Sequence, residues 1–263
     1  MDYGLKDKVV LIMGGSSGVG LKTAEMFLQE GAKVVIGGRD PYRLDEAAKK
    51  LGSFHAKEKV LAKKCDVTME NDVKEVVKAA IQKFHQLDVL VNSAGRSVMG
   101  HFFDITNDQW EEQIKLKYHA IIFAVRAAYP YMKEQGGGRI ININATLSKE
   151  PEPHMVATAA TRAGLLNLSK SLAHELAADN ILVNSVSLGV IQTDQWERRR
   201  LQNAPDMEPE AYYEDLAKKR SIPLGRVGKA EEVASAILYL ASSGASYVTG
   251  TTIEVAGGIG KAL

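Results

Sequence analysis

The 263-residue sequence has one cysteine, no long apolar run and almost no net charge. The lone Cys65 excludes an internal disulfide and fits a reducing compartment. No segment approaches the length of a membrane-spanning helix, and residues 1–8 lack the basic and apolar parts of a secretion signal, so we expect a cytoplasmic protein. A formal charge of +1 gives no general attraction to nucleic acid or to acidic membranes. We therefore expect a small-molecule substrate, with neither nucleic acid nor membrane as a partner.

Blocks of like charge are also scarce. The nearest is the basic cluster at residues 197–200, which is typical of a solvated helix face. Internal repeats and linkers are absent as well. The length, with 45% hydrophobic residues, is enough for one domain with a large core over residues 1–263.

Short β-branched runs alternate with longer helical patterns along the whole chain. The runs lie at residues 8–13, 33–37, 60–65, 88–92, 139–144, 181–186 and 252–255. This alternation predicts βαβ units, and hence an α/β fold with a parallel sheet between helices. A capping box at Thr106 and Gln109 predicts the start of a long helix.

The alternation breaks between residues 192 and 223, where prolines and many charges follow the sixth predicted strand. In an open α/β sheet, ligands bind beyond the carboxyl ends of the strands. A long irregular segment at that edge is typical of an active-site lid. We therefore predict a substrate lid at about residues 192–223.

A glycine-rich turn follows the first predicted strand and opens an amphipathic helix. Glycines at these spacings permit a tight turn, a close approach of backbone to phosphate and close packing of helix on strand, while the helix amino end supplies N–H donors. The turn therefore predicts a dinucleotide site, with a purely structural glycine turn as the alternative. The candidate pyrophosphate-binding residues are Gly14, Ser16, Ser17, Gly18, Val19 and Gly20.

The end of the second predicted strand bears on the choice of cofactor. Gly38 stands where a carboxylate would bind the ribose 2′-hydroxyl of NAD, and Arg39 follows it. A guanidinium suits a 2′-phosphate because it is always charged and binds in bidentate fashion. We therefore predict NADP(H) over NAD(H), with a surface Arg39 paired to Asp40 as the alternative.

These features together resemble the short-chain dehydrogenase/reductase superfamily over nearly the whole chain. The resemblance is carried by residues 14–20 (cofactor glycine motif), 65–67 (adenine-contacting segment), 92–95 (Asn-Ser-Ala-Gly turn) and 221–226 (end of the lid). It implies a Rossmann-like, doubly wound sheet of seven parallel strands with helices on both faces. It also implies a homotetramer formed through the long helices around residues 107–134 and 155–178.

The resemblance extends to the remaining cofactor contacts. It implies contacts from Asp66, Val67, Asn92, Ala94, Gly95, Arg162, Gly189, Ile191 and Thr193. Two positions depart from the superfamily pattern, since Leu188 replaces a proline and Ala256 replaces an aspartate. Neither change forbids cofactor binding, and both fit a divergent branch.

The catalytic positions of the superfamily are all replaced. Its members use a tyrosine as acid/base, a lysine four residues later, a serine and an asparagine. The flanking segments place these positions on Thr158, Arg162, Ala145 and Lys117, respectively. No tyrosine lies between residues 131 and 212 to restore the motif. Because an aliphatic hydroxyl is a far poorer proton donor than a phenol, tyrosine-driven carbonyl reduction is not expected.

Other residues are candidates for the chemistry. Lys117 and Arg162 are expected to face the nicotinamide end, where Arg162 would lower the pKa of Lys117 and make it a general acid/base or an amine nucleophile. The alternative is that Lys117 pairs with a carboxylate or lies in a tetramer contact. His154 is an alternative acid on a pocket loop, or a solvated histidine. Asn144 either positions substrate or caps the loop, and the candidate site requires no metal.

Three functions remain open from the sequence. The first is an NADP(H)-dependent oxidoreductase with altered proton transfer, acting on a small carbonyl, hydroxyl or conjugated substrate, with an anionic one as an option. The second is a non-redox lyase, isomerase or decarboxylase that uses Lys117 or His154. The third is a catalytically silent nucleotide-binding subunit.

Overall fold

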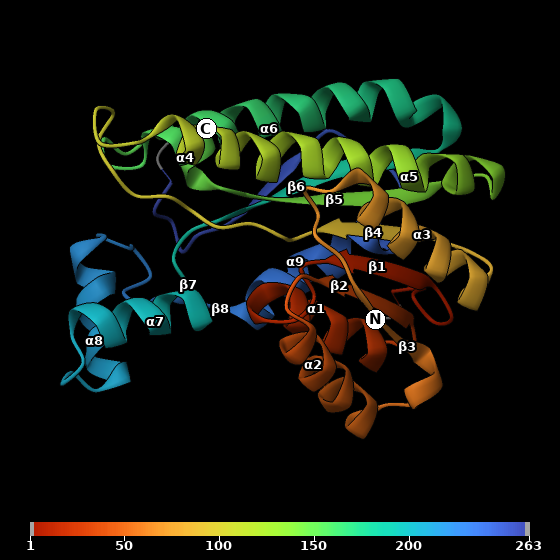
Figure 1. The fold of residues 1–263 in the computed structure, drawn as a ribbon, viewed down its shortest axis with the longest axis horizontal. Helices are drawn as coiled ribbons and strands as arrows, with labels where there is room; N and C mark the ends of the chain where they lie inside the picture. The colour runs from red at the N-terminus through yellow and green to blue at the C-terminus, as the bar shows by residue number, and fades with distance from the viewer. Residues whose placement is uncertain (1–2, 261–263) are drawn as a thin grey trace.

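Seven strands pair in parallel in the order β3-β2-β1-β4-β5-β6-β9, and helices cover both faces of the sheet (Figure 1). The computed structural model describes residues 3–260. The strands of the sheet are β1 (Val9–Met13), β2 (Lys33–Gly38), β3 (Val60–Lys64), β4 (Val89–Asn92), β5 (Gly138–Ala145), β6 (Ile181–Leu188) and β9 (Thr252–Val255). Each lies where the sequence predicted a strand, so the doubly wound α/β fold is confirmed. The order reverses between β1 and β4, and ligands bind at such a switch point.

The helices form two layers. In Figure 1, α1, α2 and α9 lie on one face of the sheet, and α3, α5 and α6 lie on the other. Their bounds are α1 (Gly18–Gln29), α2 (Pro41–Phe54), α3 (Glu70–Phe84), α4 (Asn107–Ile114), α5 (Ala120–Glu134), α6 (Val156–Leu176) and α9 (Ala230–Ala241). Within residues 3–260, no helix has the length and apolar character needed to cross a membrane.

Alternation along β1 shows how the sheet separates two cores. Leu11 and Met13 pack into the core under α3, α5 and α6, whereas Val10 and Ile12 pack into the core under α1, α2 and α9. All four side chains are at most 2% exposed. Because successive side chains point to opposite faces, a strand buried on both sides is apolar throughout, as the sequence of β1 is.

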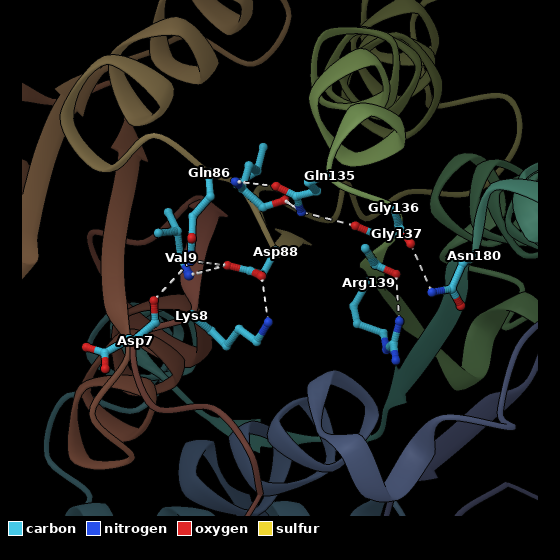
Figure 2. Close-up of polar contacts among 12 residues, drawn as sticks. Asp7, Lys8, Val9, Gln86, Asp88, Gln135, Gly136, Gly137, Arg139 and Asn180 are labelled. Carbon is cyan, nitrogen blue, oxygen red and sulfur yellow. Dashed lines mark hydrogen bonds and ion pairs between the residues drawn. The ribbon is translucent and has the colours of Figure 1, made fainter.

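Polar contacts hold the amino-terminal edge of the sheet together (Figure 2). The carboxylate of Asp88 accepts from the Lys8 amine at 2.9 Å, from the Val9 N–H at 2.8 Å and from the Gln86 amide at 2.8 Å. Asn180 donates to the carbonyl of Gly136 at 3.1 Å, which ties the starts of β5 and β6 together. These contacts fix the edge opposite the carboxyl ends, which remain available for ligands.

The helix that opens at the Thr106 capping box is not regular throughout. The box is present as predicted. A π-helical turn, Lys115–His119, then joins α4 to α5, and no sequence pattern predicts it. Such turns are rare and often mark functional sites. This one carries Lys117.

The segment predicted as a lid projects from the sheet as a separate lobe (Figure 1). It contains α7 (Asp194–Asn203) and α8 (Pro209–Lys219), flanked by the short paired strands β7 (Ile191–Gln192) and β8 (Gly228–Lys229). Its small core is formed by Val190, Tyr213, Leu216, Ala217, Ile222 and Val227. The lobe therefore has packing of its own, while its function as a lid stays a prediction.

Candidate active site

A cavity of about 390 Å³ lies at the carboxyl edge of the sheet. Loops after β1, β2, β4, β5 and β6 line it, together with α7 and the π-helical turn. The cavity thus spans the β1–β4 switch point and reaches the lobe predicted as the lid. Among the described residues, no cluster of histidine, cysteine or carboxylate side chains could hold a metal ion.

The glycine-rich turn is shaped so that only glycines fit. Gly14 has a φ of 86°, and a Cβ there would lie 2.7 Å from the backbone of Ala94. A Cβ at Gly20 would lie 2.1 Å from the carbonyl oxygen of Gly14. Helix α1 begins at Gly18, and no described side chain caps its amino end, so its first N–H groups face the turn. This cradle fits a dinucleotide pyrophosphate.

Asp40, in the loop after β2, is the N-cap residue of the helix that follows. Asp40 caps α2 by accepting from the N–H groups of Tyr42 and Arg43, and it lies 3.7 Å from the Arg43 guanidinium. Arg39 is exposed, lines the cavity and forms no ion pair within residues 3–260. Its charge is therefore available to a ligand at this end of the cavity.

Most of the residues predicted to contact cofactor line the cavity. They are Gly14, Ser16, Ser17, Gly18, Val19, Gly20, Arg39, Val67, Asn92, Ala94, Gly95, Arg162, Gly189, Ile191 and Thr193. Asp66 is outside the lining, and its carboxylate accepts from the backbone N–H and the hydroxyl of Thr68. Asp66 therefore shapes the loop that presents Val67.

Lys117 is a buried amine that lines the cavity. Its side chain is 3% exposed, and its Nζ donates to the carbonyl oxygen of Arg96 at 2.6 Å and to Oε1 of Gln113 at 2.8 Å. Burial, together with the nearby charges of Arg162 and Arg96 and against the opposing effect of Glu112, lowers the pKa of Lys117 to about 7. The amine therefore changes protonation state near neutral pH.

Arg162 lines the same cavity from α6. Its Nη1 donates to the carbonyl oxygen of Ile143 at 3.3 Å, and Asn144 Nδ2 donates to the Arg162 carbonyl at 3.1 Å. The Asn144 side chain also accepts from the N–H of Ala145 at 2.9 Å. Burial lowers the pKa of Arg162 to about 10, so the guanidinium stays charged at neutral pH. Asn144 thus braces α6 against the end of β5 from a buried position.

The candidates Thr158 and His154 lie outside the described cavity lining, as does Asn144. Thr158 is fully buried, and its hydroxyl donates to the Val98 carbonyl at 3.0 Å and accepts from the Val98 N–H at 3.1 Å. The His154 ring lies 3.3 Å from the Glu152 carboxylate, which also pairs with Arg220. Ala145 does line the cavity, with no side-chain hydrogen bond to offer. The structure therefore gathers Lys117 and Arg162 at the cavity but not Thr158 or His154.

Sequence reasoning missed several charged residues of the cavity. Besides the predicted Arg39, Lys117 and Arg162, its lining includes the basic residues Arg96, Arg198, Arg199 and Arg220 and the acidic residues Glu152 and Asp194. The basic cluster at residues 197–200 was expected on a solvated face, but Arg200 is only 8% exposed and two of its neighbours line the cavity. The position of this cluster within the predicted lid is the sequence feature that could have placed it at the cavity.

Fold and cavity together define a Rossmann-like α/β protein with a dinucleotide cradle. A family sequence model described as enoyl-(acyl carrier protein) reductase matches residues 14–260. The chain is 36% identical to the 3-oxoacyl-(acyl-carrier-protein) reductase FabG of Thermotoga maritima, over 97% of this chain and 98% of that protein. It therefore belongs to the short-chain dehydrogenase/reductase superfamily, an oxidoreductase family.

Solved structures show the same architecture. A short-chain oxidoreductase of Pseudomonas aeruginosa PAO1, reported to contain an atypical catalytic center, is 36% identical with a TM-score of 0.94, covering 98% of this chain and 99% of that one. The same protein was also solved with NADPH bound. The L-sorbose reductase of Gluconobacter frateurii, complexed with NADPH and L-sorbose, is 33% identical with a TM-score of 0.95 over 100% of both chains.

Proposed function

We propose that this protein is an NADP(H)-dependent oxidoreductase of a small carbonyl or hydroxyl compound, in which Lys117 transfers the proton and Arg162 holds the substrate oxygen. The proposal rests on the position and pKa of Lys117. Its amine is buried on the cavity wall and has a pKa of about 7. Groups with a pKa near the working pH are the most effective acid/base catalysts. A lysine exposed at the surface would instead keep a pKa of about 10.4.

The cofactor assignment is supported by the glycine cradle and by Arg39. The cradle accepts a pyrophosphate at the amino end of α1. Arg39 offers an unpaired guanidinium where the adenosine ribose is expected, and this favours the 2′-phosphate of NADP(H). Two of the relatives were solved with NADPH. When bound, NADPH would supply a hydride to the carbonyl carbon and become NADP⁺.

The hydrogen bonds of Lys117 leave its amine able to accept a proton in one direction of the reaction and to donate one in the other. Its neutral amine has two N–H groups, which match its two acceptors, the Arg96 carbonyl and Gln113 Oε1. The lone pair then remains to take a proton from a substrate hydroxyl. The ammonium form has a third N–H group, which can pass its proton to a carbonyl oxygen that has received a hydride at carbon.

Arg162 has a different part in the proposal. Its guanidinium remains charged, so it cannot relay protons at neutral pH. A fixed cation beside the reacting oxygen stabilises the negative charge that develops there. Asn144 positions this residue through its bond to the Arg162 carbonyl. Thr158 positions the loop at Val98 and touches neither substrate nor cofactor in this scheme.

The test compares Lys117→Met with Lys115→Met, an exposed control in the same π-helical turn that pairs with Glu111. NADPH oxidation is followed with a panel of small ketones, ketoses, oxo acids and 3-oxoacyl thioesters, and NADPH affinity is measured by calorimetry. We expect Lys117→Met to lower turnover by about 10²–10⁴-fold with unchanged NADPH affinity. Unchanged turnover would refute Lys117 as the acid, and absence of NADPH binding would refute the cofactor.

The same panel of compounds also distinguishes the proposed oxidoreductase from a non-redox enzyme and from a catalytically silent subunit. Consumption of a substrate without a change in nicotinamide absorbance would indicate a non-redox enzyme. NADPH binding with no turnover on any compound would favour a silent subunit.

We also propose the homotetramer expected of the superfamily. Helices α5 and α6 carry the partly exposed apolar side chains Phe123, Leu168 and Leu172 on the long surface expected to form the contact. Sedimentation velocity tests this assembly, and a monomer at micromolar concentration would contradict it.

A further inference from the structure

We infer that Arg199 is a specificity-determining residue that binds the carboxylate of the substrate, which makes the substrate class a small oxo acid or the corresponding hydroxy acid. This inference rests on the proposed function and deepens it. Lys117 and Arg162 would act on the carbonyl, while Arg199 would hold the acid group at the lid side of the same cavity.

Arg199 is held in place by an aromatic platform. Its guanidinium carbon lies 4.6 Å from the ring centroid of Trp196, one helical turn earlier on α7. Trp196 in turn packs against the small core of the lobe. A guanidinium over an aromatic face keeps N–H groups at its edge, in the planar arrangement that matches the two oxygens of a carboxylate. The packing therefore presents a preformed donor pair.

The other arginines near this part of the cavity either have protein partners or, like Arg198, are exposed to solvent. Arg96 pairs with Glu112, and Arg220 pairs with Glu152. Arg200 bonds the Glu197 carboxylate and the Met207 carbonyl at 2.6 Å. Within residues 3–260, Arg199 forms no ion pair or hydrogen bond, and its guanidinium lies over the Trp196 ring.

The surroundings of Arg199 disfavour the charged form of its guanidinium. It is half-buried, and both burial and the nearby Arg220 lower its pKa, while only Tyr212 opposes them. A partly desolvated cation without a carboxylate is costly unless a ligand supplies the counter-charge. An anionic substrate group would provide that counter-charge.

The position of Arg199 separates it from the phosphates of the cofactor. A Cβ on Gly18 would lie 3.5 Å from the Thr193 side chain, so α7 starts beside the pyrophosphate cradle. Arg199 follows six residues later, or about 9 Å along the helix. Its neighbour Arg220 pairs with Glu152, on the loop that follows Ala145 at the catalytic end. Arg199 therefore lies toward the substrate rather than the pyrophosphate.

The proposed reaction is the reversible reduction of an oxo acid to a hydroxy acid by NADPH. In the reduction, the oxo carbon gains a hydride from NADPH and the oxygen gains the proton of the Lys117 ammonium, which the amine then regains from water. An oxo acid, NADPH and one proton thus become a hydroxy acid and NADP⁺. The carboxylate is unchanged, and its role is to orient the carbonyl.

The experiment compares Arg199→Ala and Arg199→Lys with the control Lys219→Ala, an exposed residue of the same lobe that pairs with Asp215. The probes are 2-, 3- and 4-oxo acids of four to six carbons, each paired with its carboxamide, and phosphorylated ketones. We expect the wild type to prefer one acid over its amide by about 10²-fold in kcat/KM. Arg199→Ala should remove that preference through KM, Arg199→Lys should restore part of it, and NADPH affinity should not change.

Two outcomes would overturn the inference. One is an equal loss for acid and amide in Arg199→Ala, and the other is a preference for phosphorylated ketones over all oxo acids. Calorimetric binding of the oxo acids to the NADP⁺-loaded Lys117→Met protein separates this inference from the proposed function. Arg199-dependent binding there supports the carboxylate site even if Lys117 is not the acid, and absence of any binding rejects the site.

Discussion

The amine nitrogen of Lys117 lies 2.8 Å from the side-chain oxygen of Gln113, and both side chains are buried where α4 passes into the π-helical turn. Gln113 points its acceptor at the amine, while its own amide nitrogen has no partner among the described residues. Because an amide oxygen bonds the ammonium form more strongly than the neutral amine, we predict that Gln113 raises the pKa of Lys117 without touching the substrate.

Changing Gln113 is therefore predicted to move the pH profile in a direction set by the new side chain. Gln113→Leu removes an acceptor and should lower the pKa of Lys117 below about 7. Gln113→Glu places an opposite charge beside the amine and should raise it. The measurement is the alkaline limb of kcat for reduction, which should shift down in the first variant and up in the second. Shifts in the same direction would contradict a positioning role.

The wild-type enzyme should show opposite pH dependences in its two directions. As the pH rises through about 7, the ammonium form of Lys117 is lost and the neutral amine appears. Reduction needs the ammonium form and should slow, whereas oxidation needs the neutral amine and should accelerate. Initial rates of both directions between pH 5.5 and pH 9 test this, with Lys117→Met as the control that should lose both dependences. A reduction rate that increases with pH would refute this assignment.

Thr158 stands at the superfamily's tyrosine position, yet its hydroxyl is predicted to matter for stability rather than for turnover. Thr158→Val should lose both bonds to Val98 and the longer one, 3.4 Å, to Gln113 Oε1, and should lower the free energy of unfolding by about 1–3 kcal/mol. We expect kcat to be nearly unchanged, because Gln113 keeps its shorter bond to Lys117. Thr161→Val is the matched control, because its hydroxyl bonds only carbonyls of its own helix. Chemical denaturation and turnover are measured together. A large loss of kcat at unchanged stability would make Thr158 catalytic.

The sequence predicted the strands well but not the state of individual side chains. The β-branched run of β1 identifies a strand because burial on both faces makes every residue apolar. The flanking segments also fix which residues occupy the superfamily's catalytic positions. They cannot reveal that the Thr158 hydroxyl turns toward Val98, since that depends on a loop sixty residues away.

Arg199 is a second side chain whose orientation the sequence does not predict. Helix α7 has only two large apolar side chains, Trp196 and Leu201, so its periodicity gives no sign of which arginine faces inward. Arg200 is buried by partners on its own lobe, and Arg199 lies on Trp196. The π-helical turn is likewise invisible in the sequence, because a single wide turn leaves no repeat to detect.

The choice between NADP(H) and NAD(H) is predicted to depend on Arg39. Arg39→Ala should weaken NADPH binding by about 10–100-fold, because a charged guanidinium–phosphate pair is lost, and should leave NADH binding nearly unchanged. Arg43→Ala is the matched control in the first turn of α2, since Arg43 lies beside Asp40 and outside the described cavity lining. Calorimetric titration with both nucleotides measures the effect. Equal losses for NADPH and NADH would reject the 2′-phosphate contact.

Packing between Gly164 and Tyr118 is predicted to set how closely the helix of Arg162 approaches that of Lys117. A Cβ at Gly164 would lie 2.1 Å from the Tyr118 hydroxyl and 2.8 Å from the ring carbon that bears it. Gly164→Ala should therefore lower the free energy of unfolding by about 1–3 kcal/mol through overpacking. Adding Tyr118→Leu should recover part of this loss, because it removes the atoms that clash.

Gly52→Ala supplies the control for that experiment. Its Cβ would meet only the Lys57 side chain at 3.6 Å, an ordinary contact on α2, so this variant should be neutral or slightly more stable. Turnover distinguishes a local clash from a shifted site: we expect Gly164→Ala to lose kcat as well as stability, since Tyr118 is the neighbour of Lys117 in the π-helical turn. Equal stabilities of Gly164→Ala and Gly52→Ala would show that Tyr118 swings aside freely and that the spacing of the two helices is set elsewhere.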